Sequence, residues 1–271
     1  MAIKNGNLQR WLTGVALGVT LLMIILLGSL ELLAVVVTLA ILIGIWEYNS
    51  IVFGQGFRKE KVESLIFAVL IPLIVLLGNS QMLVALLAFA VMTVFIVFLW
   101  RVNETNFDVS GVAKVIFGLL YIPLLTSHYI LLRKLDSGIY WIIMVLLIAV
   151  IGDTVALYVG KSLGKRKLLE LVSPGKTVEG TIGLIVGSTL TACLFGYFLF
   201  PKIAMVHFLI LGLVGGIVGQ LGDLCESAIK RNHGKKDASS LLPGHGGLMD
   251  RMDSLIFVAP FVYYYRIFVI G

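Results

Sequence analysis

The chain has 271 residues, of which 59% are hydrophobic and 13% charged, and its mean hydropathy is +1.03. A soluble domain is about 45–50% apolar and about 25% charged, so this composition excludes a water-soluble globule, a disordered chain and a disulfide scaffold. The formal net charge is +6, from 21 lysines and arginines against 15 acids. The composition predicts a polytopic membrane protein.

Long apolar segments follow one another along the whole chain. A membrane-spanning helix needs about 20 mostly apolar residues, and the sequence lacks the short alternating pattern of barrel strands. Because backbone groups in lipid must be paired within the chain, the segments predict an all-α, polytopic integral membrane fold. We expect about nine transmembrane helices, at roughly 11–29, 32–53, 64–79, 81–100, 113–131, 139–159, 177–200, 203–229 and 251–270.

Recognisable motifs are confined to the second part of the chain. Residues 1–110 form N-terminal transmembrane helices without a motif, and residues 111–271 form C-terminal transmembrane helices that carry the candidate catalytic site. The sequence assigns no role to the first part.

The basic residues predict the topology. With a cytoplasmic N-terminus, 17 of the 21 lysines and arginines fall in inside segments and 4 outside, which is the bias that the positive-inside rule describes. We therefore expect a multi-pass protein of the cell membrane with its C-terminus outside. The two most basic segments, 161–176 and 230–251, are both predicted on the cytoplasmic face.

Six acids lie in or beside the later predicted spans, although an ionised acid at a helix centre costs about 2.5–3.5 kcal/mol on insertion scales. The six are Asp153, Glu179, Asp223, Glu226, Asp250 and Asp253. Two pairs among them are three residues apart and share a helix face. Carboxylates without thiolate or histidine partners favour Mg²⁺, which binds one or two of them plus substrate phosphates. Only His233 and His245 lie nearby, so Zn²⁺ is disfavoured.

Lysines beside glycines predict phosphate binding at 160–165 and 173–177, where turn residues expose backbone N–H groups. Ser173 and Pro174 are predicted as the N-cap and first turn of the helix that follows, and 243–247 repeats the arrangement. Arg166 and Lys167 are explained by topology alone. Small residues four apart in 203–229, namely Gly212 with Gly216 and Gly215 with Gly219, predict close helix packing.

Two stretches together resemble the phosphatidate cytidylyltransferase (CDP-diacylglycerol synthase) family. The downstream one runs Ser227, Lys230-Arg231, Lys236-Asp237, Ser239, Leu242-Pro243, His245-Gly246-Gly247, Asp250-Arg251 and Asp253. The upstream one runs Asp153-Thr154, Ala156, Gly160-Lys161, Gly164-Lys165, Ser173-Pro174, Lys176-Thr177 and Glu179-Gly180. One departure is Leu157, where the family usually has an aromatic residue.

The resemblance implies an enzyme that transfers the cytidylyl group of CTP to phosphatidic acid with Mg²⁺. The products are CDP-diacylglycerol and pyrophosphate, formed at the cytoplasmic face of the lipid bilayer for phospholipid biosynthesis. No nucleic acid is expected as a partner, and a homodimer is among the oligomeric states left open.

The resemblance also implies roles for residues of the two stretches. The catalytic candidates are Lys176, Lys230, Arg231, Lys236, Asp237, His245, Arg251 and Asp253. The substrate-binding candidates are Asp153, Lys161, Lys165, Ser173, Thr177, Glu179, Ser227, Gly246 and Gly247. Apart from the resemblance, the metal-ligand candidates are Asp223 and Asp250, which the loop between the last two predicted spans can bring face to face, with Asp253 a close third. Because the attacking phosphate is already ionised, we expect His245 to position phosphate rather than to abstract a proton.

Two other functions fit parts of the pattern. An ion-coupled transporter also carries intramembrane acids, but it predicts repeated halves and polar residues at the bilayer midplane. A CTP-dependent lipid kinase would instead transfer the γ-phosphate to an alcohol and release CDP. Analysis of the reaction products separates the kinase from a cytidylyltransferase.

Overall fold

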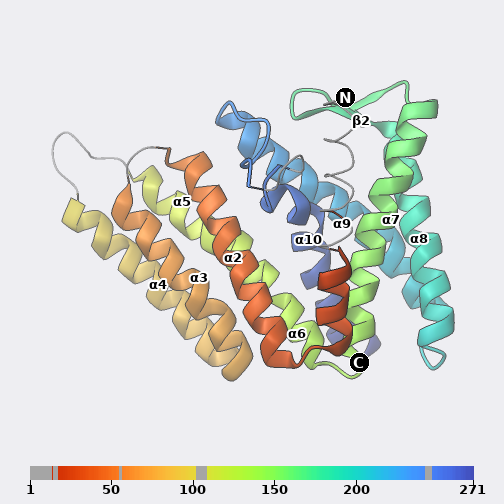
Figure 1. The fold of residues 1–271 in the computed structure, drawn as a ribbon, viewed down its shortest axis with the longest axis horizontal. Helices are drawn as coiled ribbons and strands as arrows, with labels where there is room; N and C mark the ends of the chain where they lie inside the picture. The colour runs from red at the N-terminus through yellow and green to blue at the C-terminus, as the bar shows by residue number, and fades with distance from the viewer. Residues whose placement is uncertain (1–13, 15–17, 55–56, 102–108, 242–245) are drawn as a thin grey trace, which may run out of the picture. The chain divides into compact units, whose positions relative to one another are not determined.

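A computed structural model describes residues 14, 18–54, 57–101, 109–241 and 246–271 (Figure 1). Contacts between residues divide the chain into two compact units. Unit 1 contains residues 1–134 and 237–250, and unit 2 contains residues 135–236 and 251–271. These units are defined by contacts between residues. The boundary near residue 110 that the sequence suggests instead separates the part of the chain without motifs from the part that carries them.

Unit 1 is a bundle of apolar helices. Its described helices are Gly18–Leu27, α2 (Leu30–Val52), α3 (Arg58–Leu77), α4 (Ser80–Arg101), α5 (Ser110–Leu119), the π-helical turn η1 (Leu120–Leu124) and α6 (His128–Lys134). Helix α3 packs against α2, α4 and α5 (Figure 1). Aromatic and branched side chains such as Phe67, Ile71 and Val94 form the buried core between these helices. The segment 237–250 also belongs to this unit.

Unit 2 is built around three long helices. Its elements are α7 (Gly138–Leu163), β1 (Lys167–Leu169), β2 (Ser173–Thr177), α8 (Val178–Leu199), α9 (Met205–Asn232), α10 (Met249–Tyr265, from Arg251 onward) and η2 (Arg266–Ile270). Helix α8 packs along both α7 and α9, and α7 and α8 lie side by side in Figure 1. Large apolar side chains on the outer surfaces of these helices, such as Leu190 and Phe198, are exposed in the isolated chain and suit contact with lipid.

The all-α prediction is confirmed, and so is the multi-pass character. Among the described residues, seven helical segments are long and apolar enough to cross a bilayer. The predicted count of nine is not reached. The first predicted span begins in residues outside the described ranges, and α3 starts with a run of charged residues, so that its apolar part is shorter. Each of the remaining predicted spans coincides with a spanning segment of the structure.

A small antiparallel hairpin, β1 paired with β2, precedes α8. The prediction that Ser173 and Pro174 start this helix is wrong, because both lie in β2. The N-cap is Thr177, which has an extended backbone and accepts a hydrogen bond on its hydroxyl from the Gly180 N–H at 3.1 Å. Thr177 also pairs with Lys167 across the hairpin. The strand pairing therefore holds 173–177 extended, and the helix begins only after a threonine cap.

The glycines of α9 allow close packing of the helices of unit 2, as the sequence predicts. A Cβ at Gly212 would lie 2.4 Å from the Thr189 Cα atom and 2.8 Å from the Ser188 carbonyl oxygen of α8. A Cβ at Gly222 would lie 2.5 Å from the carbonyl oxygen of Asp253 in α10. Glycine at 212 thus permits α8 to approach α9, and glycine at 222 permits α10 to do so.

We expect Gly212→Val to destabilise the protein by about 1–3 kcal/mol, because the added side chain collides with the backbone of α8. Thermal unfolding in detergent measures the effect. The matched control is Gly175→Val, since a Cβ at Gly175 has no neighbour within 4 Å. Equal unfolding temperatures for the two variants would contradict the packing role of Gly212.

Candidate active site

Three acids of unit 2 lie around one lysine. The ammonium of Lys176, on β2, is 2.5 Å from a carboxylate oxygen of Asp223 on α9. Asp153 on α7 and Asp253 on α10 interact electrostatically with both Asp223 and Lys176. Neighbouring carboxylates repel one another, and the Lys176 ammonium offsets part of this repulsion. Strand β2 and helices α7, α9 and α10 thus each contribute one charged group to this cluster, whose three carboxylates are the acid cluster.

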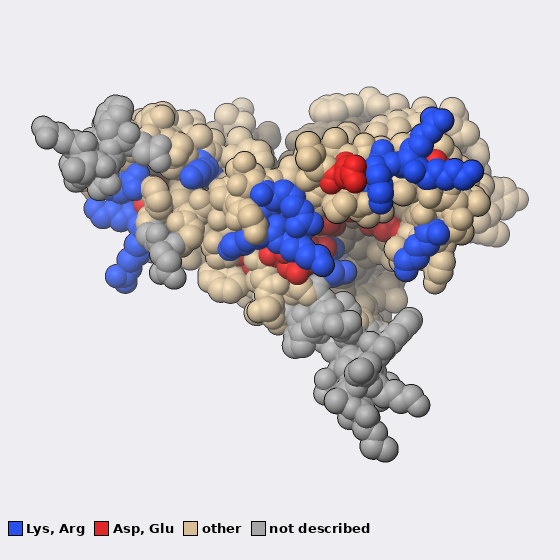
Figure 2. Space-filling model, turned by 90° about the horizontal axis from the view of Figure 1, so that it is seen from above, with Lys and Arg blue, Asp and Glu red and all other residues tan. Residues whose placement is uncertain are grey.

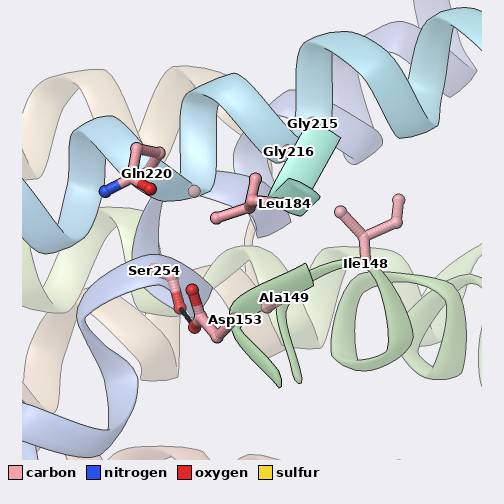
Figure 3. A pocket seen from close by; sticks show the side chains of 9 residues that line it. Ile148, Ala149, Asp153, Leu184, Gly215, Gly216, Gln220 and Ser254 are labelled. Carbon is pink, nitrogen blue, oxygen red and sulfur yellow. Dashed lines mark hydrogen bonds between the residues drawn. The ribbon is translucent and has the colours of Figure 1, made fainter. Parts of the chain in front are cut away.

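A narrow cleft with both polar and apolar lining lies beside Asp153. The Ser254 hydroxyl of α10 donates a hydrogen bond to the Asp153 carboxylate at 3.4 Å, and Figure 3 shows this contact between the two helices. Gln220 of α9 lines the same cleft. Its side-chain nitrogen is buried without a hydrogen-bond partner among the described residues. The cleft is too narrow for a nucleotide, so it extends the acid cluster into the bundle rather than providing a substrate pocket.

The hairpin that carries Lys176 is fixed by hydrogen bonds from several elements. The Lys167 ammonium donates to the Pro174 carbonyl at 2.6 Å. Arg231, at the end of α9, donates to the Val172 carbonyl at 3.3 Å. The hairpin that carries Lys176 therefore contacts the end of α9.

The loop between α7 and β1 is held by Glu179 in the first turn of α8. The Glu179 carboxylate accepts backbone N–H bonds from Lys165 at 3.0 Å and Arg166 at 3.2 Å. Glu179 thus contacts backbone of its own unit, and this contact gives it a structural function beside the predicted substrate-binding one. The side chains of Lys161 and Lys165 are exposed, and Figure 2 shows lysine and arginine side chains gathered on the face with the hairpin, with carboxylates among them.

The last turns of α9 carry further predicted residues. The Ser227 hydroxyl donates to Asp223 at 3.3 Å. Lys230 forms an ion pair with Glu226 one turn earlier, and the Glu226 side chain is fully buried. Arg231 also donates to the Lys235 carbonyl at 3.2 Å, and the side chain of Lys236 is exposed. Ser227 thus contacts Asp223 of the acid cluster directly. Lys230 instead pairs with Glu226 within α9, and Arg231 contacts backbone carbonyls of the hairpin and of the residues after α9.

The predicted residues that the structure describes between Asp237 and Asp250 belong to unit 1. The Asp250 carboxylate accepts backbone N–H bonds from Ala238 at 2.9 Å and from Gly247 at 2.8 Å. Gly246 has a φ of +81°, which favours glycine, and Asp237 is exposed nearby. Asp250 therefore joins the two ends of the segment that leads into α10.

The last two catalytic candidates are His245 and Arg251. His245 lies outside the described residues. Arg251, in the first turn of α10, has an exposed side chain. The predicted metal ligands are divided, since Asp223 and Asp253 belong to unit 2 and Asp250 to unit 1.

The donor chemistry of unit 2 fits Mg²⁺. Within the described ranges, no three Asp, Glu, His or Cys side chains are close enough to enclose a metal ion by themselves. Mg²⁺ does not need such a cage, because it binds through one or two carboxylates, keeps several waters and takes the rest of its ligands from substrate phosphates. Asp223 and Asp253 supply carboxylates of this kind.

The sequence did not identify three polar residues that line the cleft or contact the segment before α10. They are Glu47, Gln220 and Ser254. Gln220 and Ser254 line the cleft beside Asp153. Glu47 is fully buried in α2 and contacts the segment before α10. An acid within an apolar span is a signal for function, so the sequence offered a signal for Glu47 itself, although not for its partners.

The chain is similar to known proteins along almost its whole length. A family described as "Cytidylyltransferase family" matches residues 8–269. The phosphatidate cytidylyltransferase of Bacillus subtilis (strain 168) is 33% identical over 271 residues, covering 94% of this chain and 96% of the relative. That of Staphylococcus aureus (strain COL) is 31% identical over 254 residues, covering 93% and 95%.

The match to the family covers Lys176, Asp223 and Asp253, so the geometry and the comparisons concern the same part of the chain. Both relatives cover nearly the whole chain, including the N-terminal helices that the sequence left without a role. The chain therefore belongs to the cytidylyltransferase family of integral membrane enzymes.

Proposed function

We propose that the protein transfers the cytidylyl group of CTP to phosphatidic acid, giving CDP-diacylglycerol and pyrophosphate, with Mg²⁺ as the cofactor. The observation that carries the proposal is the contact between Lys176 and Asp223 beside Asp153 and Asp253. Relatives named phosphatidate cytidylyltransferase, similar over more than nine-tenths of the chain, support this substrate pair.

The reaction joins two anions. An oxygen of the phosphatidate phosphate forms a bond to the α-phosphorus of CTP, the bond from that phosphorus to the β-phosphate oxygen breaks, and pyrophosphate leaves. A phosphate monoester carries about −1.5 to −2 charges at neutral pH, so the attacking oxygen needs no general base. The protein must instead neutralise charge and align the two phosphates.

The residues around Lys176 are suited to that task. When bound, Mg²⁺ supplies positive charge beside the phosphates of CTP. The Lys176 ammonium provides a second, fixed positive charge, and its contact with Asp223 orients it. The Ser227 hydroxyl, which donates to Asp223, holds the carboxylate in place. Asp153 and Asp253 are further carboxylates that interact electrostatically with this lysine.

We also propose that this site faces the cytoplasm, where CTP is made. The positive-inside rule supports this orientation, because 17 of the 21 basic residues belong to segments predicted inside. Phosphatidic acid reaches such a site from the surrounding bilayer, and the exposed lysines beside the hairpin would attract its anionic headgroup.

Purified protein with CTP, phosphatidic acid and Mg²⁺ tests the proposal. We expect a lipid product that requires all three components. ATP in place of CTP, or diacylglycerol in place of phosphatidic acid, should give no product. Product formed from diacylglycerol would support a lipid kinase and contradict the proposal.

A further inference from the structure

Glu47 is a buried acid in an apolar helix. It lies near the C-terminal end of α2, and its side chain has no exposed surface. A buried carboxylate is costly unless hydrogen bonds satisfy both of its oxygens. The hydrogen-bond donors that contact Glu47 therefore indicate its function.

Both oxygens of Glu47 accept hydrogen bonds from a segment about two hundred residues away in the sequence. The Ser239 hydroxyl donates to Oε1 at 2.5 Å, and the Leu248 N–H donates to the same oxygen at 2.9 Å. The Met249 N–H donates to Oε2 at 2.7 Å. Met249 is the first residue of α10, so the carboxylate binds N–H groups that have no acceptor within the helix. Glu47 thus serves as the N-terminal cap of α10.

Gly247 leaves the room that this contact requires. A Cβ at Gly247 would lie 2.6 Å from Glu47 Oε1 and 2.9 Å from the Ala238 Cβ. On the other side, the Gly247 N–H donates to Asp250, and so does the Ala238 N–H. Two carboxylates, one from α2 and one from α10, therefore hold the backbone on both sides of Gly247.

We propose that Glu47 is a positioning residue, whose carboxylate fixes the backbone at Ser239 and at Gly247–Met249 and thereby orients Asp250. The part of this inference that concerns catalysis rests on the proposed function. It assigns a role to the N-terminal helices, because α2 supplies the carboxylate that accepts the Leu248 and Met249 N–H bonds. Glu47 contacts backbone and a serine hydroxyl, so it acts through the segment and not on the substrate.

Glu47→Gln tests the role with little change in size. Glutamine keeps one acceptor oxygen but turns an NH₂ group toward an N–H donor, so at least one of the three hydrogen bonds is lost. We expect hydrogen exchange in peptides covering 246–252 to rise about tenfold, because the capped amides open more often. We expect kcat for CDP-lipid formation to fall roughly ten- to a hundredfold, as for other residues that orient a functional carboxylate, with KM for CTP little changed.

Ser239 gives an independent test if Glu47→Gln folds poorly. Ser239→Ala removes one hydrogen bond to Glu47 and should raise exchange at 246–252, whereas Ser239→Thr keeps the hydroxyl and should restore both exchange and kcat. The matched control is Glu31→Gln, an exposed acid in the first turn of the same helix, for which we expect wild-type exchange and kcat.

Wild-type exchange at 246–252 in both Glu47→Gln and Ser239→Ala would overturn the proposal. So would increased exchange with an unchanged kcat per folded molecule. A wild-type protein that makes no CDP-lipid would instead contradict the proposed function. In that case the exchange measurement alone would still decide whether Glu47 holds the segment.

Discussion

Asp223→Asn is expected to lower the rate of CDP-diacylglycerol formation by at least about a hundredfold, while the protein remains folded and extractable. Asparagine has nearly the same shape but no negative charge. It therefore loses the ion pair to Lys176 and the carboxylate oxygen that we assign to Mg²⁺. Turnover at saturating CTP, normalised to the monodisperse fraction, measures the loss.

A matched control shows whether the loss belongs to this site. Glu170 lies in the exposed turn between β1 and β2, and Glu170→Gln removes one negative charge from the same unit without a contact to the acid cluster. We expect wild-type turnover for this variant. Near-normal turnover of Asp223→Asn at ordinary Mg²⁺ concentrations would contradict the role of Asp223.

The same experiment at Asp250 needs a second readout. The sequence predicts Asp250 as a metal ligand, and in the structure its carboxylate accepts N–H bonds from Ala238 and Gly247. Loss of activity in Asp250→Asn could follow from either function. Hydrogen exchange at 246–252 separates them, because only loss of the backbone contacts raises it.

Lys176→Ala is expected to lower turnover by about a hundredfold or more, since a fixed charge beside the reacting phosphates is worth roughly 2.7–4 kcal/mol. The change also leaves Asp223 without its cation, next to Asp153 and Asp253. Steady-state kinetics with CTP and phosphatidic acid in mixed micelles measures this effect.

The control for Lys176 is the double variant Arg166→Ala and Lys167→Ala. Both side chains are exposed and lie before or at the start of the hairpin. They contribute attraction to anionic lipid, worth about 1 kcal/mol each, so we expect a loss of tenfold at most. Lys167 also donates to the Pro174 carbonyl within the hairpin, so the single variant Arg166→Ala, which leaves that contact in place, is measured beside the double variant. Suppose that Lys176→Ala and the double variant lose the same turnover, at equal yield and monodispersity. This result would contradict a specific role of Lys176 and show that only the total positive charge matters.

Composition and hydropathy predicted the membrane fold because lipid imposes one strong rule, that the chain must pair its own backbone groups. The same rule placed seven of the nine predicted spans within a few residues of the spanning segments found among the described residues. It gave no information about the hairpin, since β1 and β2 lie in a short polar segment where local pairing decides the structure. Thr177, rather than Ser173, became the helix cap because strand pairing keeps 173–177 extended.

The candidate site was predicted in part. Asp223 and Asp253 were identified as acids in apolar helices, and the structure brings both close to Lys176. Glu47 was missed, although it is also an acid in an apolar helix, because its partners Ser239 and Met249 lie about two hundred residues away. A local motif cannot reveal such a contact, and only the fold brings its two parts together.

The position of a radioactive label in the products tests the central proposal most directly. Proteoliposomes that contain the protein and phosphatidic acid are supplied with Mg²⁺ and CTP labelled at either the α- or the γ-phosphate. We predict that the α-label enters the lipid and the γ-label is released as pyrophosphate, and that neither occurs with Asp223→Asn. A γ-label in the lipid with release of CDP, or no lipid product from the wild-type protein, would contradict a cytidylyltransferase.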